Sequence, residues 1–169
     1  HRTYRNLPDK VAIQLNDTHP SIAVAELMRI LVDEENVTWD NAWSMTTKVL
    51  GYTNHTVLPE ALETWPGDLF SNLLPRHLQI IQEINRRFLI QVDEKLSGES
   101  WKKESLSIIT GENNGVIHMA RLAIVGSHMI NGVSELHSDI LKRNVFKNFY
   151  ELMPERFTNV TYGITQRRW

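Results

Sequence analysis

The chain has 169 residues, of which 41% are hydrophobic and 22% charged, so it is long enough and apolar enough to form a single core. Its 18 basic and 20 acidic residues give a net charge of −2 without a block of like charge, which argues against a nucleic-acid or membrane-surface partner and favours neutral or small-molecule partners. The absence of cysteine excludes a disulfide-stapled scaffold and thiolate chemistry.

The first part of the chain predicts two strands with helices between them. The apolar runs 11–15 and 49–53 have the length of buried strands. Between them, Pro20 suits the first position of a helix, and Thr38 suits the N-cap of a second helix that extends to about Lys48. The first helix is expected to bury one apolar face, made of Ala23, Leu27, Ile30 and Leu31.

The middle of the chain predicts mainly helix. Pro59 is expected to open a short helix, which Pro66-Gly67 interrupts. A long helix is expected over 69–96, where the polar residues 97–100 end it. Its apolar stripe is expected to contain Leu74, His77, Leu78, Ile81, Ile84, Phe88 and Val92.

The last part of the chain predicts a turn at 111–115 and then a mostly helical segment from His118. A break around 127–131 is favoured, because Asn-Gly is a turn-like pair. A short helix over 145–152 leads to a weak strand over 157–161. Alternating strands and helices indicate a helix-rich α/β fold. The few strands fit part of a sheet, so residues 1–169 are expected to form a single partial domain.

Polar side chains follow both of the first two predicted strands. Asp17 and His19 come after the first, and Asn54 and His55 after the second. In parallel α/β sheets, ligands bind beyond the carboxyl ends of the strands. These side chains are therefore expected to share one rim and to form a binding site.

The sequence gives little support for a metal site or for a catalytic nucleophile. Asp17/His19 and His137/Asp139 could be ligand pairs, with His55 as a third ligand. The sequence has no His-Glu-x-x-His pattern and no tight cluster of four ligands, so no metal is expected. His137 lies on an apolar helical stripe, which is more typical of a hydrogen-bonded core histidine. Ser127-His128 has no nucleophile-elbow context, and no phosphate-binding glycine loop is present.

Carboxylates and tryptophans favour carbohydrate chemistry weakly. Glu60 and Glu63 are three apart on the helix expected after Pro59, so they would share a face, as an acid/base couple for glycoside hydrolysis requires. For each carboxylate alone, a structural role is favoured; Glu60 would stabilise the helix N-terminus. Asparagine, aspartate and neutral histidine hydrogen-bond sugar hydroxyls. Four tryptophans are candidates for stacking on sugar rings, namely Trp39, Trp43, Trp65 and Trp101, although the first two are more typical of a core.

Several longer motifs run through the chain in a fixed order. They are Val-Ala-Ile-Gln-Leu-Asn-Asp-Thr-His-Pro at 11–20, Tyr-Thr-Asn-His-Thr-Val-Leu-Pro-Glu-Ala-Leu-Glu at 52–63, Leu-Leu-Pro-Arg-His-Leu at 73–78, Ile-Val-Gly-Ser-His at 124–128 and Gly-Ile-Thr-Gln-Arg-Arg-Trp at 163–169. Together they closely resemble the glycogen/maltodextrin phosphorylases and extend over essentially all of the chain.

This resemblance implies the two-domain glycosyltransferase-B architecture, with pyridoxal 5′-phosphate in the cleft between two Rossmann-like halves. Such enzymes release glucose 1-phosphate from the non-reducing end of an α-1,4-glucan by phosphorolysis, with the cofactor phosphate as a proton relay to substrate phosphate. The chain would be the latter part of the N-terminal domain, ending at the crossover to the C-terminal domain. The full-length protein would be an allosteric homodimer, and a cytoplasmic location is expected since no signal peptide is present.

The resemblance also assigns roles to residues of this chain. His55 matches the histidine that hydrogen-bonds the glucosyl 6-hydroxyl, and Trp169 matches the tryptophan that touches the cofactor. Other matched positions line or adjoin the sugar pocket, namely Asp17, His19, Glu60, Glu63, Asn131 and Val133.

Two positions depart from the family pattern. The family has Asn where this chain has Tyr162, and often Pro at Gln166. That Asn shares the 6-hydroxyl with the histidine, so the phenol of Tyr162 would fill the glucose subsite or change its specificity.

The cofactor-binding lysine and the substrate-phosphate ligands are expected outside residues 1–169. The chain alone is therefore expected to contain no catalytic residue and to be inactive. Two alternatives stay open. One is a non-catalytic carbohydrate-binding or structural fragment disabled at Tyr162, and the other is a glycoside hydrolase that uses Glu60 and Glu63.

Overall fold

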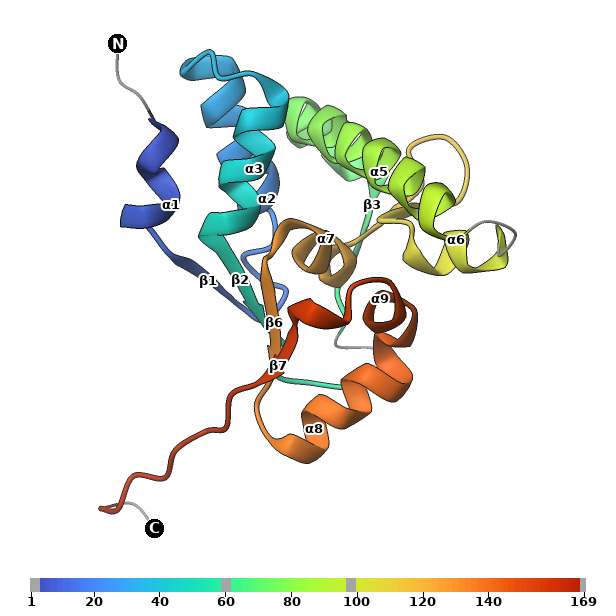
Figure 1. Ribbon diagram of the computed structural model, residues 1–169. Coiled ribbons are helices and arrows are strands. Elements are labelled where there is room, and N and C mark those ends of the chain that lie inside the picture. Colours follow the sequence, from blue (N-terminus) through green and yellow to red (C-terminus); the bar gives the residue numbers. More distant parts are fainter. Residues whose placement is uncertain (1–3, 59–61, 97–99, 168–169) are drawn as a thin grey trace.

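A parallel four-stranded sheet organises the fold, in the order β1-β2-β6-β7 (Figure 1). The computed structural model describes residues 4–58, 62–96 and 100–167. The strands of this sheet are β1 (Ile13–Asn16), β2 (Leu50–Thr53), β6 (Met129–Gly132) and β7 (Phe157–Asn159). All neighbouring strands are parallel, so their carboxyl ends lie at one edge of the sheet.

Every connection between these strands contains helices, as is usual for the crossovers of a parallel sheet. Helix α7 packs on β2, and α2 and α3 both contact α7. The α-helices are α1 (Leu7–Lys10), α2 (Ala23–Arg29), α3 (Trp39–Val49), α4 (Gly67–Leu73), α5 (Pro75–Lys95), α6 (Ser100–Leu106), α7 (Met119–Gly126), α8 (Glu135–Ile140) and α9 (Lys147–Leu152). Short 3₁₀ or π segments are Tyr4–Asn6, Ile30–Glu34, Leu141–Val145 and Pro154–Arg156.

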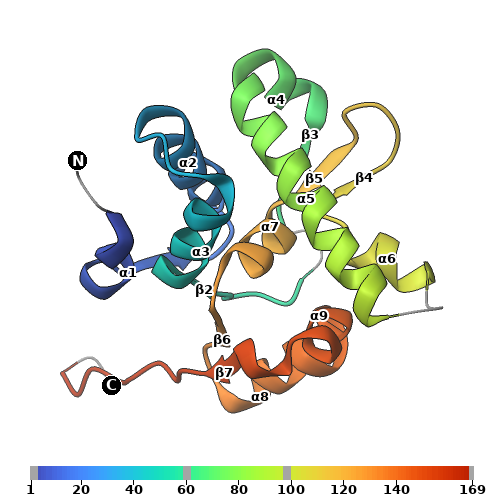
Figure 2. The same ribbon diagram turned by 45° about the horizontal axis from the view of Figure 1, so that its top comes forward.

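A small antiparallel sheet lies beside α4 and α5 (Figure 2). Its strands run in the order β3 (Thr64–Pro66), β5 (Val116–His118) and β4 (Ile109–Thr110). The predicted turn at 111–115 is confirmed, because it joins β4 to β5 and contains three positive φ angles. Gly67 begins α4 where a Cβ would lie 1.9 Å from the Asn114 carbonyl oxygen, so only glycine fits there.

Buried side chains from β1, β2, β6 and the surrounding helices form one core. Leu15, Tyr52 and Ile130 lie side by side on β1, β2 and β6, and all three are 0% exposed. Met28 of α2 and Leu122 of α7 are equally buried. The sheet is therefore fixed by apolar packing, while its carboxyl edge stays available for polar groups.

Most of the predicted elements are confirmed. The runs 11–15, 49–53 and 157–161 correspond to β1, β2 and β7, each shifted or shortened by one or two residues. The helix after Thr38 is α3, although the Thr38 side chain makes no capping hydrogen bond. The helix predicted over 145–152 corresponds mainly to α9.

The first helix begins at Ala23, so the prediction that Pro20 opens it was wrong. The carbonyl of Pro20 accepts a hydrogen bond from Ala23 N–H (2.9 Å) in a turn before the helix. The expected apolar face was only partly correct. The buried residues of α2 and of the π-helical segment that follows it are Val24, Ala25, Met28 and Leu31.

The single long helix predicted over 69–96 is two helices, α4 and α5, separated at Leu74. Pro75 opens α5 because it has no N–H to continue α4. Most of the predicted stripe of α5 is confirmed, but Leu74 is 38% exposed and Ile80 is an additional buried residue. Pro59 lies outside the described residues, and the helix expected after it does not include Thr64–Pro66, which forms β3.

The break predicted around 127–131 is confirmed, but its structure was not foreseen. Met129–Gly132 is not a turn between helices; it is β6, a central strand of the parallel sheet. Ile130 pairs with Tyr52 on one side and Phe157 on the other, so it is completely buried. The helical spacing of the apolar residues around it therefore misled the prediction.

Candidate functional site

The ends of three parallel strands form one polar rim. Asp17 N–H donates to the carbonyl of Thr53 (2.9 Å), and Asn54 N–H donates to the carbonyl of Asn131 (2.9 Å), so β1, β2 and β6 end level with one another. Asp17 has a φ of 66°, a conformation that aspartate tolerates better than most residues. Its Oδ1 accepts from Thr18 N–H (2.7 Å), which fixes the sharp turn after β1.

His55 lies on this rim, in the irregular segment 54–58 after β2. Its Nε2 is hydrogen-bonded to Oδ1 of Asn16, and its Nδ1 to the hydroxyl of Tyr162. Since Asn16 Oδ1 can only accept, the neutral ring carries its proton on Nε2 and accepts the Tyr162 proton at Nδ1. The two rings are also stacked, with centroids 5.6 Å apart and 28° between their planes. Tyr162 thus occupies the Nδ1 acceptor of His55.

Asn131 contributes a buried amide beneath the rim. Gln14 Nε2 donates to Thr53 Oγ1 (2.8 Å), which donates in turn to Asn131 Oδ1 (2.8 Å). The amide nitrogen of Asn131 donates to the carbonyl of Gly132 (2.9 Å). Asn131 is only 7% exposed, so its side chain serves to order the turn that follows β6.

The segment after β7 runs beside that turn. Val160 N–H donates to the carbonyl of Gly132 (3.2 Å), and Tyr162 N–H donates to that of Val133 (3.2 Å). These bonds extend the pairing of β7 with β6 and carry the Tyr162 side chain to His55. Tyr162 is 61% exposed and therefore rests on the surface of the rim.

His19 and Glu63 belong to a second cluster. Glu63 accepts hydrogen bonds from Thr18 Oγ1 (3.1 Å) and Trp65 Nε1 (2.9 Å), and His19 Nδ1 lies 3.9 Å from its carboxylate. The His19 side chain is 83% exposed, at a cavity of about 240 Å³ that Trp65 and Phe70 also line. The structure thus brings Asp17, His55, Asn131, Val133 and Tyr162 to the rim, and His19 and Glu63 to a neighbouring site.

The prediction that Glu60 and Glu63 share a helix face was wrong for Glu63. Residue 63 precedes β3 in an irregular conformation, and its carbonyl accepts the backbone N–H of Met119 (3.1 Å). Strand pairing with β5 therefore overrides any helix there. Glu60 and Trp169 lie outside the described residues.

One functional candidate of the rim, His137, was not assigned to a binding site from the sequence, and its partner is the predicted rim residue Asn54. Asn54 is completely buried, and His137 of α8 is hydrogen-bonded to its Oδ1 (3.1 Å). Burial lowers the pKa of His137, the nearby His55 ring lowers it further, and the Asp17 carboxylate opposes both. A signal was available in Ser134, an N-cap residue that places His137 in the first turn of a helix directly after β6.

Other histidines have structural partners. His77 Nε2 lies 2.6 Å from Glu26, whose pKa is lowered to about 2, chiefly by its hydrogen bond from Arg29. Within residues 4–58, 62–96 and 100–167, no three His, Asp or Glu side chains are grouped so that they could hold a metal ion. None of the helices in these ranges combines the length and apolar character needed to cross a membrane.

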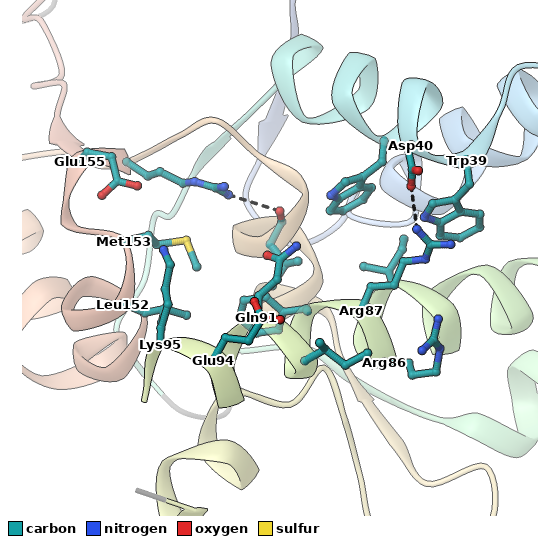
Figure 3. A pocket seen from close by; sticks show the side chains of 16 residues that line it. Trp39, Asp40, Arg86, Arg87, Gln91, Glu94, Lys95, Leu152, Met153 and Glu155 are labelled. Atoms are coloured by element: carbon teal, nitrogen blue, oxygen red, sulfur yellow. Dashed lines mark hydrogen bonds and ion pairs between the residues drawn. The ribbon is translucent and has the colours of Figure 1, made fainter. Parts of the chain in front are cut away.

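A cavity of about 600 Å³ lies away from the rim, between α3, α5 and the segment before β7 (Figure 3). Several of the polar groups that line it are bonded to other groups of the protein. Arg87 donates to Asp40 (2.7 Å) and lies over the Trp39 ring, 5.2 Å from its centroid. Arg156 donates to the backbone carbonyl of Ser127 (3.1 Å). These contacts hold the walls of the cavity together, so we assign these side chains a structural role.

Comparison with known proteins identifies the family. Residues 1–169 match the phosphorylase family model, described as carbohydrate phosphorylase. The chain is 57% identical over 164 residues to glycogen phosphorylase of Chlamydia pneumoniae, covering 97% of this chain and 20% of that protein. It is 53% identical over 169 residues to glycogen phosphorylase of Chlamydia trachomatis (100% and 21%) and 58% over 162 residues to the human muscle form (96% and 19%). The chain spans about a fifth of the length of these relatives. It belongs to the carbohydrate phosphorylase family.

Proposed function

We propose that the protein carrying this chain is an α-1,4-glucan phosphorylase that releases glucose 1-phosphate from glycogen or maltodextrin. The observation that carries this proposal is the rim, where His55 and Asn131 lie together in a chain more than half identical to glycogen phosphorylases. Residues 1–169 would be the latter part of the N-terminal domain of a glycosyltransferase-B fold and end at the crossover. The whole enzyme would be a cytoplasmic, allosteric homodimer.

The rim would bind the glucosyl unit rather than break its bond. His55 would offer Nδ1 as an acceptor once Tyr162 is displaced, because Asn16 already takes the Nε2 donor. The strand ends supply amide and carboxylate oxygens, which suit sugar hydroxyls. The turn at Asn131–Val133 would lie against the sugar, and Asp17 would line the adjoining pocket. His19, Glu60 and Glu63 would lie near this pocket but farther from the sugar. This segment would therefore contribute substrate affinity and orientation, with no catalytic group of its own.

The cofactor would be pyridoxal 5′-phosphate, whose phosphate supplies a proton relay to substrate phosphate. Among the described residues, the side chains hydrogen-bonded to one another at the rim include no lysine or arginine. That donor set suits a sugar better than a phosphate group. The cofactor would be held covalently by a lysine elsewhere in the protein, and Trp169 would contact it.

A phosphate-dependence assay tests this function. The full-length protein is incubated with maltodextrin, with and without inorganic phosphate, and glucose 1-phosphate and free glucose are measured. We expect glucose 1-phosphate only when phosphate is present. Free glucose released without phosphate would instead support the hydrolase alternative. The 169-residue chain alone is expected to release neither product.

The contact between Tyr162 and His55 favours a second candidate, a carbohydrate-binding protein without phosphorylase activity. The Tyr162 hydroxyl is bonded to Nδ1 of His55 and its ring lies on the imidazole, so a sugar hydroxyl would have to displace it. If Tyr162 blocks the subsite, the full-length protein will bind glucan without forming glucose 1-phosphate. The Tyr162 variant described below separates this candidate from an active enzyme.

A further inference from the structure

A chain of hydrogen bonds runs through His137 beneath the rim. Val133 N–H donates to His137 Nδ1 (3.1 Å), and His137 Nε2 lies 3.1 Å from Asn54 Oδ1. The same Asn54 oxygen accepts from Thr56 N–H (3.0 Å), while its amide nitrogen donates to the Tyr52 hydroxyl (3.1 Å). His137 therefore bridges the residues that follow β6 and those that follow β2.

The bonding partners fix the tautomer of His137 from both sides. Val133 N–H is a backbone donor, so Nδ1 must be unprotonated. Thr56 N–H is also a backbone donor, so Oδ1 is the Asn54 atom that faces it, and His137 Nε2 must donate to that oxygen. Both requirements select the neutral ring with its proton on Nε2. Protonation of Nδ1 would place two donors face to face and break the bond to Val133.

The helix that carries His137 is held firmly against the sheet. Ser134 Oγ caps α8 by accepting from the His137 N–H (3.1 Å), and Ser138 Oγ donates to Asn159 Oδ1 at the end of β7 (2.9 Å). A Cβ on Gly132 would lie 2.6 Å from Ser138 Oγ, so the first turn of α8 packs directly on β6. These contacts hold the His137 ring in one position. A residue must be held in this way to order a binding site.

We propose that His137 is a positioning residue of the sugar pocket, which sets the segment carrying His55 against the turn at Asn131–Val133. This inference rests on the proposed function. His137 acts through Asn54 on one side and through the Val133 backbone on the other, and it need not touch substrate. Every partner it uses belongs to the described residues, so the bridge is complete within this chain.

The charged and titratable groups that face His137 support the neutral ring. Burial is the main cause that lowers the pKa of His137, His55 from the segment after β2 lowers it further, and Asp17 from the turn after β1 opposes both effects. Tyr52 is buried, which raises the pKa of its hydroxyl and keeps it neutral. Glucan binding is therefore expected to weaken when acid finally protonates His137.

Two substitutions separate the arms of the bridge in the full-length protein. In His137→Asn, the side-chain oxygen can still accept from Val133 N–H, but the link to Asn54 is lost. In His137→Gln, the longer amide can still reach Asn54, but the link to Val133 is lost. We expect each variant to raise the KM for maltodextrin about 10-fold, which corresponds to a loss of about 1.4 kcal/mol of binding free energy. We expect kcat to stay within about 3-fold of wild type.

His128→Asn is the matched control. His128 is also bonded to β2, through the Leu50 carbonyl (2.7 Å), but at the opposite end of the strand. Its substitution should change KM less than about 2-fold, because this end of β2 lies away from the rim. Wild-type KM in both His137 variants would overturn the positioning role. So would an equal rise in KM in His128→Asn.

A measurement on the wild-type protein does not depend on the folding of variants. ¹⁵N NMR of the His137 ring shows which nitrogen carries the proton. We expect a proton on Nε2 alone at pH 7, and a proton on Nδ1 would overturn the inference. An active wild type with unaffected His137 variants would overturn this inference alone, whereas a wild type without phosphorolysis would overturn the proposed function and the inference with it.

Discussion

Thr53 and Asn131, 78 residues apart in sequence, are joined side chain to side chain at the ends of neighbouring strands. Thr53 Oγ1 donates to Asn131 Oδ1 (2.8 Å), and the two residues are also paired in the register of β2 and β6. Thr53 accepts in turn from Gln14 of β1 (2.8 Å). One hydroxyl therefore links the ends of three strands, and the rim depends on the sheet register for its geometry.

Thr53→Val should destabilise the protein by about 1–2 kcal/mol. Valine keeps the shape of threonine but removes the hydroxyl, which leaves the buried Asn131 oxygen without its donor. The change can be measured as the shift in the urea unfolding midpoint. Thr47→Val is the control, because Thr47 Oγ1 bonds only to carbonyls of its own helix, and a shift of less than about 0.5 kcal/mol is expected. Equal shifts in the two variants would contradict the linking role of Thr53.

Gly132→Ala should destabilise the protein by about 1–3 kcal/mol. The added Cβ would lie 2.6 Å from Ser138 Oγ and 2.9 Å from Ser138 N, so α8 must move away from β6. The matched variant is Gly163→Ala, whose Cβ meets nothing within 4 Å. Thermal unfolding of both variants tests this, and a lower midpoint in Gly163→Ala than in Gly132→Ala would refute the close approach.

His118 should make the stability of the protein depend on pH between about 4 and 6.5. Burial, followed by the charge of Arg121, lowers its pKa from 6.5 to about 4. Over that range the unfolded chain binds a proton that the folded chain does not, so stability is complete above pH 6.5 and falls as the pH falls toward 4. In His118→Asn, the difference in unfolding free energy between pH 7 and pH 4.5 should become smaller. An unchanged difference would show that His118 is not the titrating group.

Tyr162→Asn should increase phosphorolysis by the full-length protein. The substitution removes the phenol that is bonded to Nδ1 of His55, so a sugar hydroxyl no longer has to displace it. We expect kcat/KM for maltodextrin to rise about 10-fold, since a charge-neutral hydrogen bond of this kind is worth about 1 kcal/mol or somewhat more. Equal rates in the variant and wild type would show that the site tolerates Tyr162.

The sequence predicted the elements that depend on local signals. The apolar runs ending near Leu15 and Thr53 gave two strands of the sheet, and the polar residues after them gave the rim that carries Asp17 and His55. The rule that ligands bind beyond the carboxyl ends of parallel strands needed only these two strands.

Features that depend on tertiary pairing could not be read from local pattern. Met129–Gly132 has helix-like spacing on both sides, and only pairing with β2 and β7 makes it a strand. Glu63 looked helical for the same reason, because β3 exists only through β5. The bridge from His137 to Asn54 joins residues 83 positions apart, so no short-range motif reveals it.

The most direct test of the sugar site is His55→Ala in the full-length protein, with His128→Ala as the control. His55 lies on the rim, whereas His128 lies at the amino end of β6. Phosphorolysis of maltodextrin is measured for both variants and for wild type. We predict that His55→Ala lowers kcat/KM at least about 10-fold and that His128→Ala changes it less than about 2-fold. A kcat/KM of His55→Ala equal to that of wild type would contradict the assignment of the rim as the sugar site.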